Sequence, residues 1–276
     1  MLQLSYSTCP NDTFIFYALA HNLIKCEEFK LQIKLKDVER LNQKARTGML
    51  DISKLSFAAI GHLQDKYGLL RSGAALGRGC GPLVVARPGT KLAQLESKKI
   101  AVPGLWTTAC LLLGLFMSGK PDVVPLPFDK IMPAIQQGSF DFGVIIHEGR
   151  FTFKKYGLVK LLDLGEWWES ETSLPIPLGG IAIRRDIGQK IVQKVDAAIH
   201  ASIEYAFNHR SETDSYIKKY AQEMDQAVIR QHIDLYVNNF TSELGNEGAE
   251  AIARLFDTAR DKKLIPQSDL PLFASS

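Results

Sequence analysis

The sequence carries a weak internal repeat with a spacing of about ninety residues. In residues 41–57, and again in residues 131–147, a helical pattern leads into Gly-x-x-Asp and an apolar strand. Gly48 and Gly138 suit the position just after a helix, where the backbone turns left-handed. Upstream of each copy, a short apolar strand, a polar turn and an apolar helix follow in the same order. The repeat predicts two lobes of similar topology; the alternative is two ordinary α/β units that look alike by chance.

The alternation of strand and helix patterns in the first half indicates an α/β protein with largely parallel sheets. The expected strands are 2–6, 31–35, a strand from 51, and 82–86, and the expected helices are 14–23, 38–47 and 109–117. After an apolar strand at 181–183, the remaining patterns are helical, at 186–208, 225–237 and 247–262. The second half therefore ends in a helical C-terminal region.

Two Gly-flanked strands mark where the chain crosses between the lobes, at 82–88 and 176–184. We expect lobe one to comprise residues 1–87 and 177–276, and lobe two residues 88–176. This is a bilobed binding-protein architecture with a cleft between the lobes. Ligands of open parallel sheets bind beyond the carboxyl ends of the strands. That rule selects four loops, at 7–13, 53–57, 104–108 and 147–151.

Charge and composition restrict the class of ligand. Lys and Arg number 33 against 30 Asp and Glu, without a run of like charge, so no site for nucleic acid or an anionic membrane is indicated. The longest apolar stretch, 109–117, is far shorter than the ~18 residues that span a bilayer. The four cysteines and six histidines form no metal-binding or disulfide motif. We expect a small-molecule ligand, no metal and a cytoplasmic location, since no signal peptide precedes the first strand. Nothing in the sequence specifies an oligomeric state.

Three places carry polar groups suited to the expected cleft. His147 ends a buried strand and precedes a loop, so its ring is a candidate general base, although a lone His is often structural. Thr107 and Thr108 precede an apolar helix, whose first turn is an anion site as well as an ordinary cap. Asn11, in the turn of residues 8–13, offers the same chemistry from the other lobe, or simply caps the next helix.

The other candidates have weaker support from the pattern. The remaining histidines lie on or beside helical patterns, which favours structural or solvent-facing roles: His21, His62, His200, His209 and His232. The glycine-rich segment 73–81 lacks phosphate-loop spacing and is interpreted as a hinge or close-approach loop. Cys80 has no basic neighbour that would make it a nucleophile. Trp167 and Trp168 are interpreted as packing between lobes rather than as a cleft wall.

Several blocks together resemble the 1,4-dihydroxy-6-naphthoate synthases of the futalosine route to menaquinone. They are Ser7-Thr-Cys-Pro-Asn-Asp-Thr-Phe-Ile-Phe16, Gly79-Cys-Gly-Pro-Leu-Val-Val85, Thr107-Thr108, Ile-Ile-His147-Glu-Gly-Arg150 and Tyr236-Val-Asn-Asn-Phe-Thr241. The first block is specific, and the likeness covers essentially the whole chain. The family's usual opening has Pro where this chain has Thr8, a change that removes no proposed chemical group.

The resemblance implies a type II periplasmic-binding-protein fold used as an enzyme without a cofactor. The implied reaction converts cyclic de-hypoxanthinyl futalosine, a carboxylate, to 1,4-dihydroxy-6-naphthoate with release of a sugar-derived fragment. By position, Leu55, Ser56, Phe57, Thr107 and Thr108 correspond to substrate-contacting residues. His147 corresponds to the proton acceptor.

Two rival functions remain open at this point. One is chorismate dehydratase, an enzyme of the same pathway with a similar fold. The other is a solute receptor that binds a ligand without chemistry. The missing signal peptide argues against the receptor, and a His at a strand end argues for catalysis.

Overall fold

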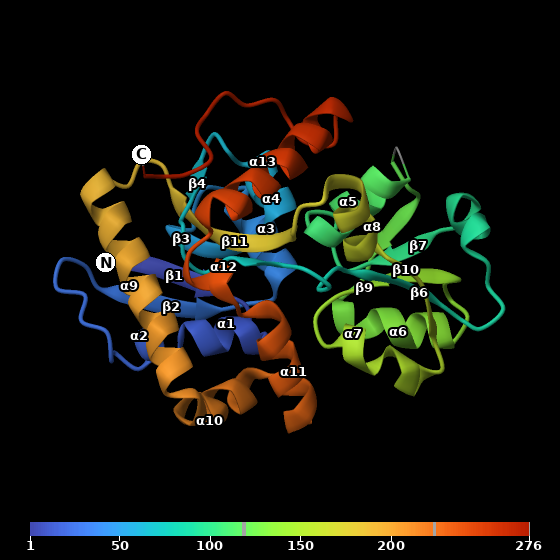
Figure 1. Cartoon of the computed structure of the whole chain (residues 1–276), viewed down its shortest axis with the longest axis horizontal. Coiled ribbons are helices and arrows are strands. Elements are labelled where there is room, and N and C mark those ends of the chain that lie inside the picture. Colours follow the sequence, from blue (N-terminus) through green and yellow to red (C-terminus); the bar gives the residue numbers. More distant parts are fainter. Residues whose placement is uncertain (118–119, 223–224, 276) are drawn as a thin grey trace.

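The computed structural model describes residues 1–117, 120–222 and 225–275 and contains two β-sheets (Figure 1). The first sheet comprises β1 (Leu2–Tyr6), β2 (Leu31–Leu35), β3 (Ile52–Ser56), β4 (Tyr67–Leu69), β5 (Ala75–Gly77) and β11 (Ile176–Arg184). The second comprises β6 (Leu83–Ala86), β7 (Ile100–Val102), β8 (Val123–Pro125), β9 (Phe142–Ile145) and β10 (Val159–Asp163). Figure 1 shows the chain ends beside the first sheet and the green middle of the chain around the second.

The two sheets have the same strand order, which explains the sequence repeat. The first runs β2-β1-β3-β11-β4 and the second β8-β7-β9-β6-β10. The first three strands of each are parallel neighbours, and the last two pair antiparallel. Each sheet thus combines three parallel strands with an antiparallel strand beside the third: β6, which directly precedes β7 in the chain, and β11, which lies more than a hundred residues after β3.

Strand β6 belongs to the second sheet, whereas the expected boundary at residue 87 assigned it to lobe one. It pairs antiparallel with β9 over four residues, from Leu83 opposite Ile145 to Ala86 opposite Phe142. Pattern alone cannot assign a strand at a crossing, because its apolar residues fit either sheet. We propose that the first crossing lies before β6 and the second between residues 173 and 176.

Helices cover both sheets. In the first part of the chain these are α1 (Pro10–Ile15), α2 (Tyr17–Ala20), α3 (Val38–Ala45) and α4 (Phe57–His62). In the middle they are η1 (Leu92–Ser97), α5 (Thr108–Phe116), α6 (Phe128–Gln136), α7 (Gly149–Thr152), η2 (Phe153–Tyr156) and α8 (Leu164–Thr172). The C-terminal region is helical as expected, with α9 (Gln189–Asn208), α10 (Arg210–Tyr220), α11 (Gln226–Tyr236), α12 (Asn239–Ser242) and α13 (Gly245–Asp261).

The first helical stretch differs from the expected helix at 14–23. Helix α1 begins at Pro10, because proline lacks an N–H and fits the first turn, and Phe16 separates α1 from α2. Phe16 is fully buried and stacks on Tyr6 of β1, with 4.4 Å between ring centroids. The early start places Asn11 and Asp12 inside the first turn of a helix rather than in an open loop.

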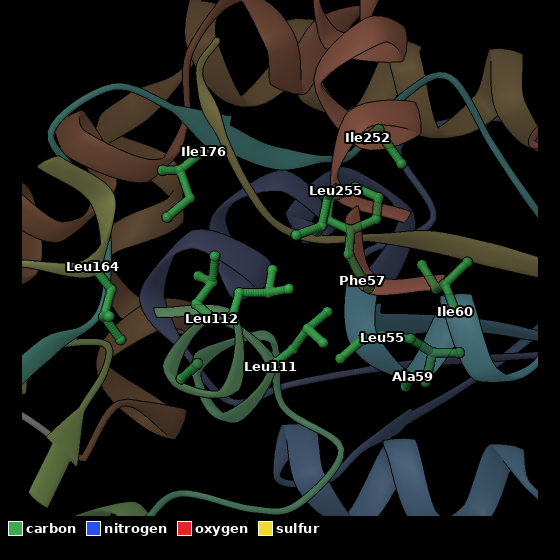
Figure 2. Packing of buried hydrophobic residues seen from close by; sticks show 14 of the residues in the cluster. Leu55, Phe57, Ala59, Ile60, Leu111, Leu112, Leu164, Ile176, Ile252 and Leu255 are labelled. Atoms are coloured by element: carbon green, nitrogen blue, oxygen red, sulfur yellow. The ribbon is translucent and has the colours of Figure 1, made fainter. Parts of the chain in front are cut away.

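One apolar core extends across both sheets. Alternate residues of β11 face opposite sides, so Ile181 and Ile183 pack under α9, while Ala182 joins the core beneath α4 and α13. The core beneath α4 and α13 continues into α5 and α8 of the other half. Figure 2 shows members of this core from both halves, including Leu55, Leu112, Leu164 and Leu255. Burial of this apolar surface stabilises the two halves against each other.

Where the chain first crosses between the sheets, its backbone packs directly against the backbone of helix α8. A Cβ atom on Gly81 would lie 2.2 Å from the backbone nitrogen of Gly165, so no side chain fits at either glycine. Arg150 fixes this contact, because its guanidinium donates to the Gly81 carbonyl and to Asp163, each at 2.7 Å. The close-approach interpretation holds for the end of segment 73–81, whereas its centre forms strand β5.

No helix in the described ranges is both long and apolar enough to cross a membrane.

Candidate active site

A cavity lies between the two sheets, where parallel strands of both end. Its walls come from the segments after β1, β3, β7 and β9, from β11, and from α11. The lining residues are Ser7, Asn11, Asp12, Val38, Lys54, Leu55, Ser56, Ala75, Cys80, Pro82, Thr107, Thr108, Ala109, Ile146, His147, Leu178, Gly179, His232 and Tyr236. The four loops expected from the strand-end rule therefore all contribute to one partly open, mostly apolar site.

His147 occupies a strained backbone position at the carboxyl end of β9. Its φ of 55° is left-handed, a conformation that few residues other than glycine adopt and that clusters at functional sites. The ring packs edge-on to Phe128 of the second half, with centroids 5.2 Å apart. It lies nearly parallel to His232 of the first half, at 6.2 Å. The imidazole thus lies where both halves of the molecule meet the cavity.

Cys9 is the polar neighbour of His147. Its sulfur lies 3.4 Å from His147 Nδ1, and burial raises the pKa of the thiol well above its ordinary value, with help from Glu148 and Asp12. Cys9 therefore stays protonated and uncharged near neutral pH. When His147 carries its proton on Nδ1, that N–H donates to the sulfur and Nε2 keeps a lone pair for a substrate proton.

A buried ion pair joins the turn after β1 to strand β3. The Nζ atom of Lys54 lies 3.0 Å from Asp12 Oδ1 and donates to the Gly73 carbonyl at 3.0 Å. Asp12 also accepts from the backbone N–H and hydroxyl of Ser7 and from the Asn11 amide. This network explains the polar cluster in the first block, for which the sequence suggested an anion site or a helix cap. A lysine in the buried strand β3 is a signal that could have indicated a buried acidic partner.

His232 lines the cavity, although its place in the helical pattern of α11 favoured a structural role. The side chain is fully buried, and its Nε2 lies 2.9 Å from Asn11 Oδ1. Burial, with the neighbouring His147, holds the pKa of His232 well below its ordinary value, so the ring is neutral. No local sequence signal distinguishes His232 from a core histidine, because its partner is more than two hundred residues away.

Thr107 and Thr108 lie at the start of α5 as expected, but both hydroxyl groups already donate hydrogen bonds to backbone carbonyl oxygens. Thr107 donates to the Gly104 carbonyl at 2.7 Å and accepts from the N–H of Cys110, as a helix cap does. Thr108 donates to the Leu178 carbonyl at 2.6 Å. The hydroxyls are therefore not the donors for an anion in this geometry. The first-turn N–H groups of Thr108 and Ala109 have no intrahelical acceptor and border the cavity.

Replacement of Thr107 by Val should reveal a cap rather than a ligand contact. We expect Thr107→Val to lower the free energy of unfolding by about 1 kcal/mol through loss of the cap. Affinity for an aromatic carboxylate should stay within about threefold, because no charge-assisted hydrogen bond to the ligand is lost. Thr107→Ser keeps the cap and is the control. Chemical denaturation and ligand titration of the same preparations check both values, and a loss of affinity at unchanged stability would contradict the assignment.

The three consecutive residues at the end of β3 divide between cavity and core. Leu55 and Ser56 line the cavity, and Ser56 exchanges hydrogen bonds with Asn42 through its N–H and its hydroxyl, both at 3.0 Å. Phe57 does not line the cavity, because its side chain packs edge-on against Phe256 of α13 in the apolar core. Phe57 is the first residue of α4, and the change from strand to helix there turns its side chain away from the cavity.

Trp106 clamps the two halves together beside α5. Its ring lies between His62, at 4.6 Å, and the guanidinium of Arg46, at 4.9 Å, both from the first half. Its backbone carbonyl accepts from the Asn42 amide at 3.2 Å, and its N–H donates to Glu39. The sequence patterns did not single out this contact. It fixes the start of α5, and hence the first-turn amides, relative to lobe one.

Other sequence candidates take structural roles. Trp168 is buried and donates from Nε1 to the Pro175 carbonyl, while Trp167 packs against Phe116, so neither lines the cavity. Cys80 does line it, but burial raises the pKa of its thiol to about 12, which makes it a poor nucleophile. In the described parts of the chain, no three His, Cys, Asp or Glu side chains are grouped to hold a metal ion.

Two sheets of matching topology with one cavity between them define a protein of the periplasmic-binding class. Solved structures agree on the fold: the alkanesulfonate-binding protein SsuA from Xanthomonas axonopodis pv. citri, bound to MOPS, aligns with a TM-score of 0.72 at 16% identity, over 100% of this chain and 97% of its own. A sequence model of the family described as menaquinone biosynthesis matches residues 2–261, and the chain belongs to that family.

Relatives within and near the family are similar over almost their full length. A Thermus thermophilus protein named 1,4-dihydroxy-6-naphtoate synthase is 47% identical, over 99% of this chain and 98% of its own. A Streptomyces coelicolor protein of the same name is 44% identical, over 96% and 95%. The crystal structure of AF1704 from Archaeoglobus fulgidus aligns with a TM-score of 0.90 at 35% identity, over 96% and 98%. The expected family and fold class are therefore confirmed.

Proposed function

We propose that this chain is a lyase that converts cyclic de-hypoxanthinyl futalosine to 1,4-dihydroxy-6-naphthoate without a cofactor. Membership of the menaquinone biosynthesis family and the names of two relatives at 44% and 47% identity support the reaction. The observation that carries it is His147, a base candidate in a left-handed backbone conformation just after strand β9, bordering the cavity.

The cavity contains the groups that such a reaction needs. The carboxylate of the substrate would bind the first-turn N–H groups of Thr108 and Ala109, where the helix dipole of α5 favours negative charge. The ring system would lie against apolar walls such as Leu55, Ile146 and Leu178. His147 Nε2 would then accept the proton whose removal starts the carbon–carbon bond cleavage.

Lys54 supplies a donor for negative charge that develops on a substrate oxygen. An ammonium group has three N–H donors, and the described residues engage two of them, through Asp12 and the Gly73 carbonyl. The third can donate into the cavity that Lys54 borders. A buried, positioned cation stabilises a developing oxyanion more strongly than an exposed one does.

The rival functions have less support. Both curated relatives are named naphthoate synthases, which does not favour chorismate dehydratase. A receptor needs no base, and a purely binding role leaves the strained His147 unexplained. The ligand would be a small carboxylate and the expected location the cytoplasm, in keeping with the biosynthetic relatives.

Incubation of the purified protein with each candidate substrate tests the proposal. We expect 1,4-dihydroxy-6-naphthoate to form from the cyclic futalosine derivative, detected by its absorbance and mass, and no reaction with chorismate. Dehydration of chorismate would instead identify the protein as a chorismate dehydratase. Tight binding of the cyclic derivative without turnover would identify a receptor.

A further inference from the structure

The proton on His232 is fixed by a chain of hydrogen bonds that starts at Lys54. The Asp12 carboxylate can only accept, so the Asn11 atom 3.0 Å from it must be the amide nitrogen. The Asn11 oxygen then faces His232 Nε2 at 2.9 Å, and an oxygen requires a donor. His232 therefore carries its proton on Nε2, and Nδ1 holds a lone pair.

That lone pair has no partner in the protein. Within residues 1–117, 120–222 and 225–275, no donor reaches the buried Nδ1 atom of His232. The side chain is fully buried, yet the residue borders the cavity. Buried polar atoms are nearly always hydrogen-bonded, because removing a polar group from water without a new partner costs about 1–3 kcal/mol. An orphan acceptor beside a ligand cavity indicates a donor on the ligand.

We infer that His232 Nδ1 accepts a hydrogen bond from a hydroxyl group of the ligand. This deepens the proposed function, on which it rests, because the proposed substrate and product both carry hydroxyl groups. His232 would then select hydroxylated ring systems over bare aromatic carboxylates of the same shape. A site with a buried unpaired acceptor discriminates strongly against ligands that lack the matching donor.

Two features suit His232 to this role rather than to proton abstraction from carbon. Its low pKa keeps it neutral, so it accepts a hydrogen bond without adding a charge beside His147. Its ring lies nearly parallel to that of His147, at 22°, so the two imidazoles face each other across 6.2 Å. His147 is then free to act as the base while His232 orients the ligand.

A matched pair of variants separates the two nitrogen atoms. His232→Gln places an amide donor near the position of Nε2, which retains the bond to Asn11 and removes the acceptor at Nδ1. His232→Asn places an amide near Nδ1, which retains an acceptor there and removes the bond to Asn11. The matched ligands are 1,4-dihydroxy-6-naphthoate and 2-naphthoate, which share the ring and carboxylate and differ in the hydroxyls. Calorimetric titration under anaerobic conditions measures all combinations, with thermal unfolding as the folding control.

We expect His232→Gln to bind dihydroxynaphthoate about 10-fold more weakly than the wild type, and 2-naphthoate with unchanged affinity. His232→Asn should retain more of the preference for dihydroxynaphthoate while unfolding at a lower temperature. An equal loss of affinity for both ligands in His232→Gln, or no loss of affinity for either ligand, would overturn the inference. A wild type that prefers dihydroxynaphthoate but does not turn over the cyclic futalosine derivative would overturn the proposed function and leave the hydroxyl contact standing.

Discussion

His147→Asn is expected to turn over the proposed substrate about 10²- to 10⁴-fold more slowly than the wild type, with its affinity for substrate largely kept. The loss follows from removal of the ring nitrogen that we assign to take the substrate proton. Asn is the right replacement, because it tolerates the left-handed backbone that His147 adopts at φ 55° and so adds little strain. Steady-state kinetics and thermal unfolding on one preparation measure both properties.

A surface histidine provides the control for His147→Asn. His200 lies exposed on α9, where its ring contacts the Ser242 carbonyl, and His200→Asn should leave turnover unchanged. If a fully folded His147→Asn variant turned over at the wild-type rate, the base would have to be sought elsewhere. A purely structural His147 predicts a lower unfolding temperature, with activity lost in proportion to unfolding.

Lys54→Met is expected to destabilise the protein by about 3–5 kcal/mol, because it leaves the buried Asp12 carboxylate without its cation. Lys54 and Asp12 are both almost completely buried, with 6% and 2% of their side chains exposed. Asp12→Asn should cost a similar amount, since it leaves the lysine charge uncompensated. The double variant should recover part of the loss. Urea unfolding of the three variants gives the coupling free energy directly.

An exposed ion pair provides the matched control for Lys54→Met. Lys160 lies 3.1 Å from Glu166, with 41% and 63% of the side chains exposed. Surface pairs contribute about 0–1 kcal/mol, so Lys160→Met should change the stability little. Equal effects of Lys54→Met and Lys160→Met would show that the buried pair contributes no more than a surface pair.

Local pattern was enough to predict most of the strands and the four strand-end loops that border the cavity, but not strands β4 and β5. The repeat at residues 41–57 and 131–147 corresponds to two sheets of equal strand order. The strand-end rule selected His147 and the start of α5 because each comes shortly after the end of a buried strand in the chain. These features depend on short stretches of sequence, which hydrophobic periodicity describes well.

Contacts between distant segments could not be predicted in the same way. His232 is held at the cavity by its hydrogen bond to Asn11, and Trp106 packs on Arg46 and His62. None of these pairings has a signature in the local sequence. Phe57 begins α4 and packs against Phe256 of the distant helix α13, which places it in the core. In each case tertiary packing decided the side-chain direction, which residue type and spacing leave open.

The most direct measurement of the central claim is a crystal structure of the His147→Asn variant with the cyclic futalosine derivative bound. The variant is expected to bind the substrate and turn it over much more slowly, so a crystal frozen soon after soaking should hold intact substrate in the cavity between the two sheets. We expect its carboxylate on the N–H groups of Thr108 and Ala109, a hydroxyl on His232 Nδ1, and the carbon that loses its proton within about 3–3.5 Å of the side chain at position 147. A ligand bound outside this cavity, or oriented with that carbon away from position 147, would contradict the assignment of His147 as the base.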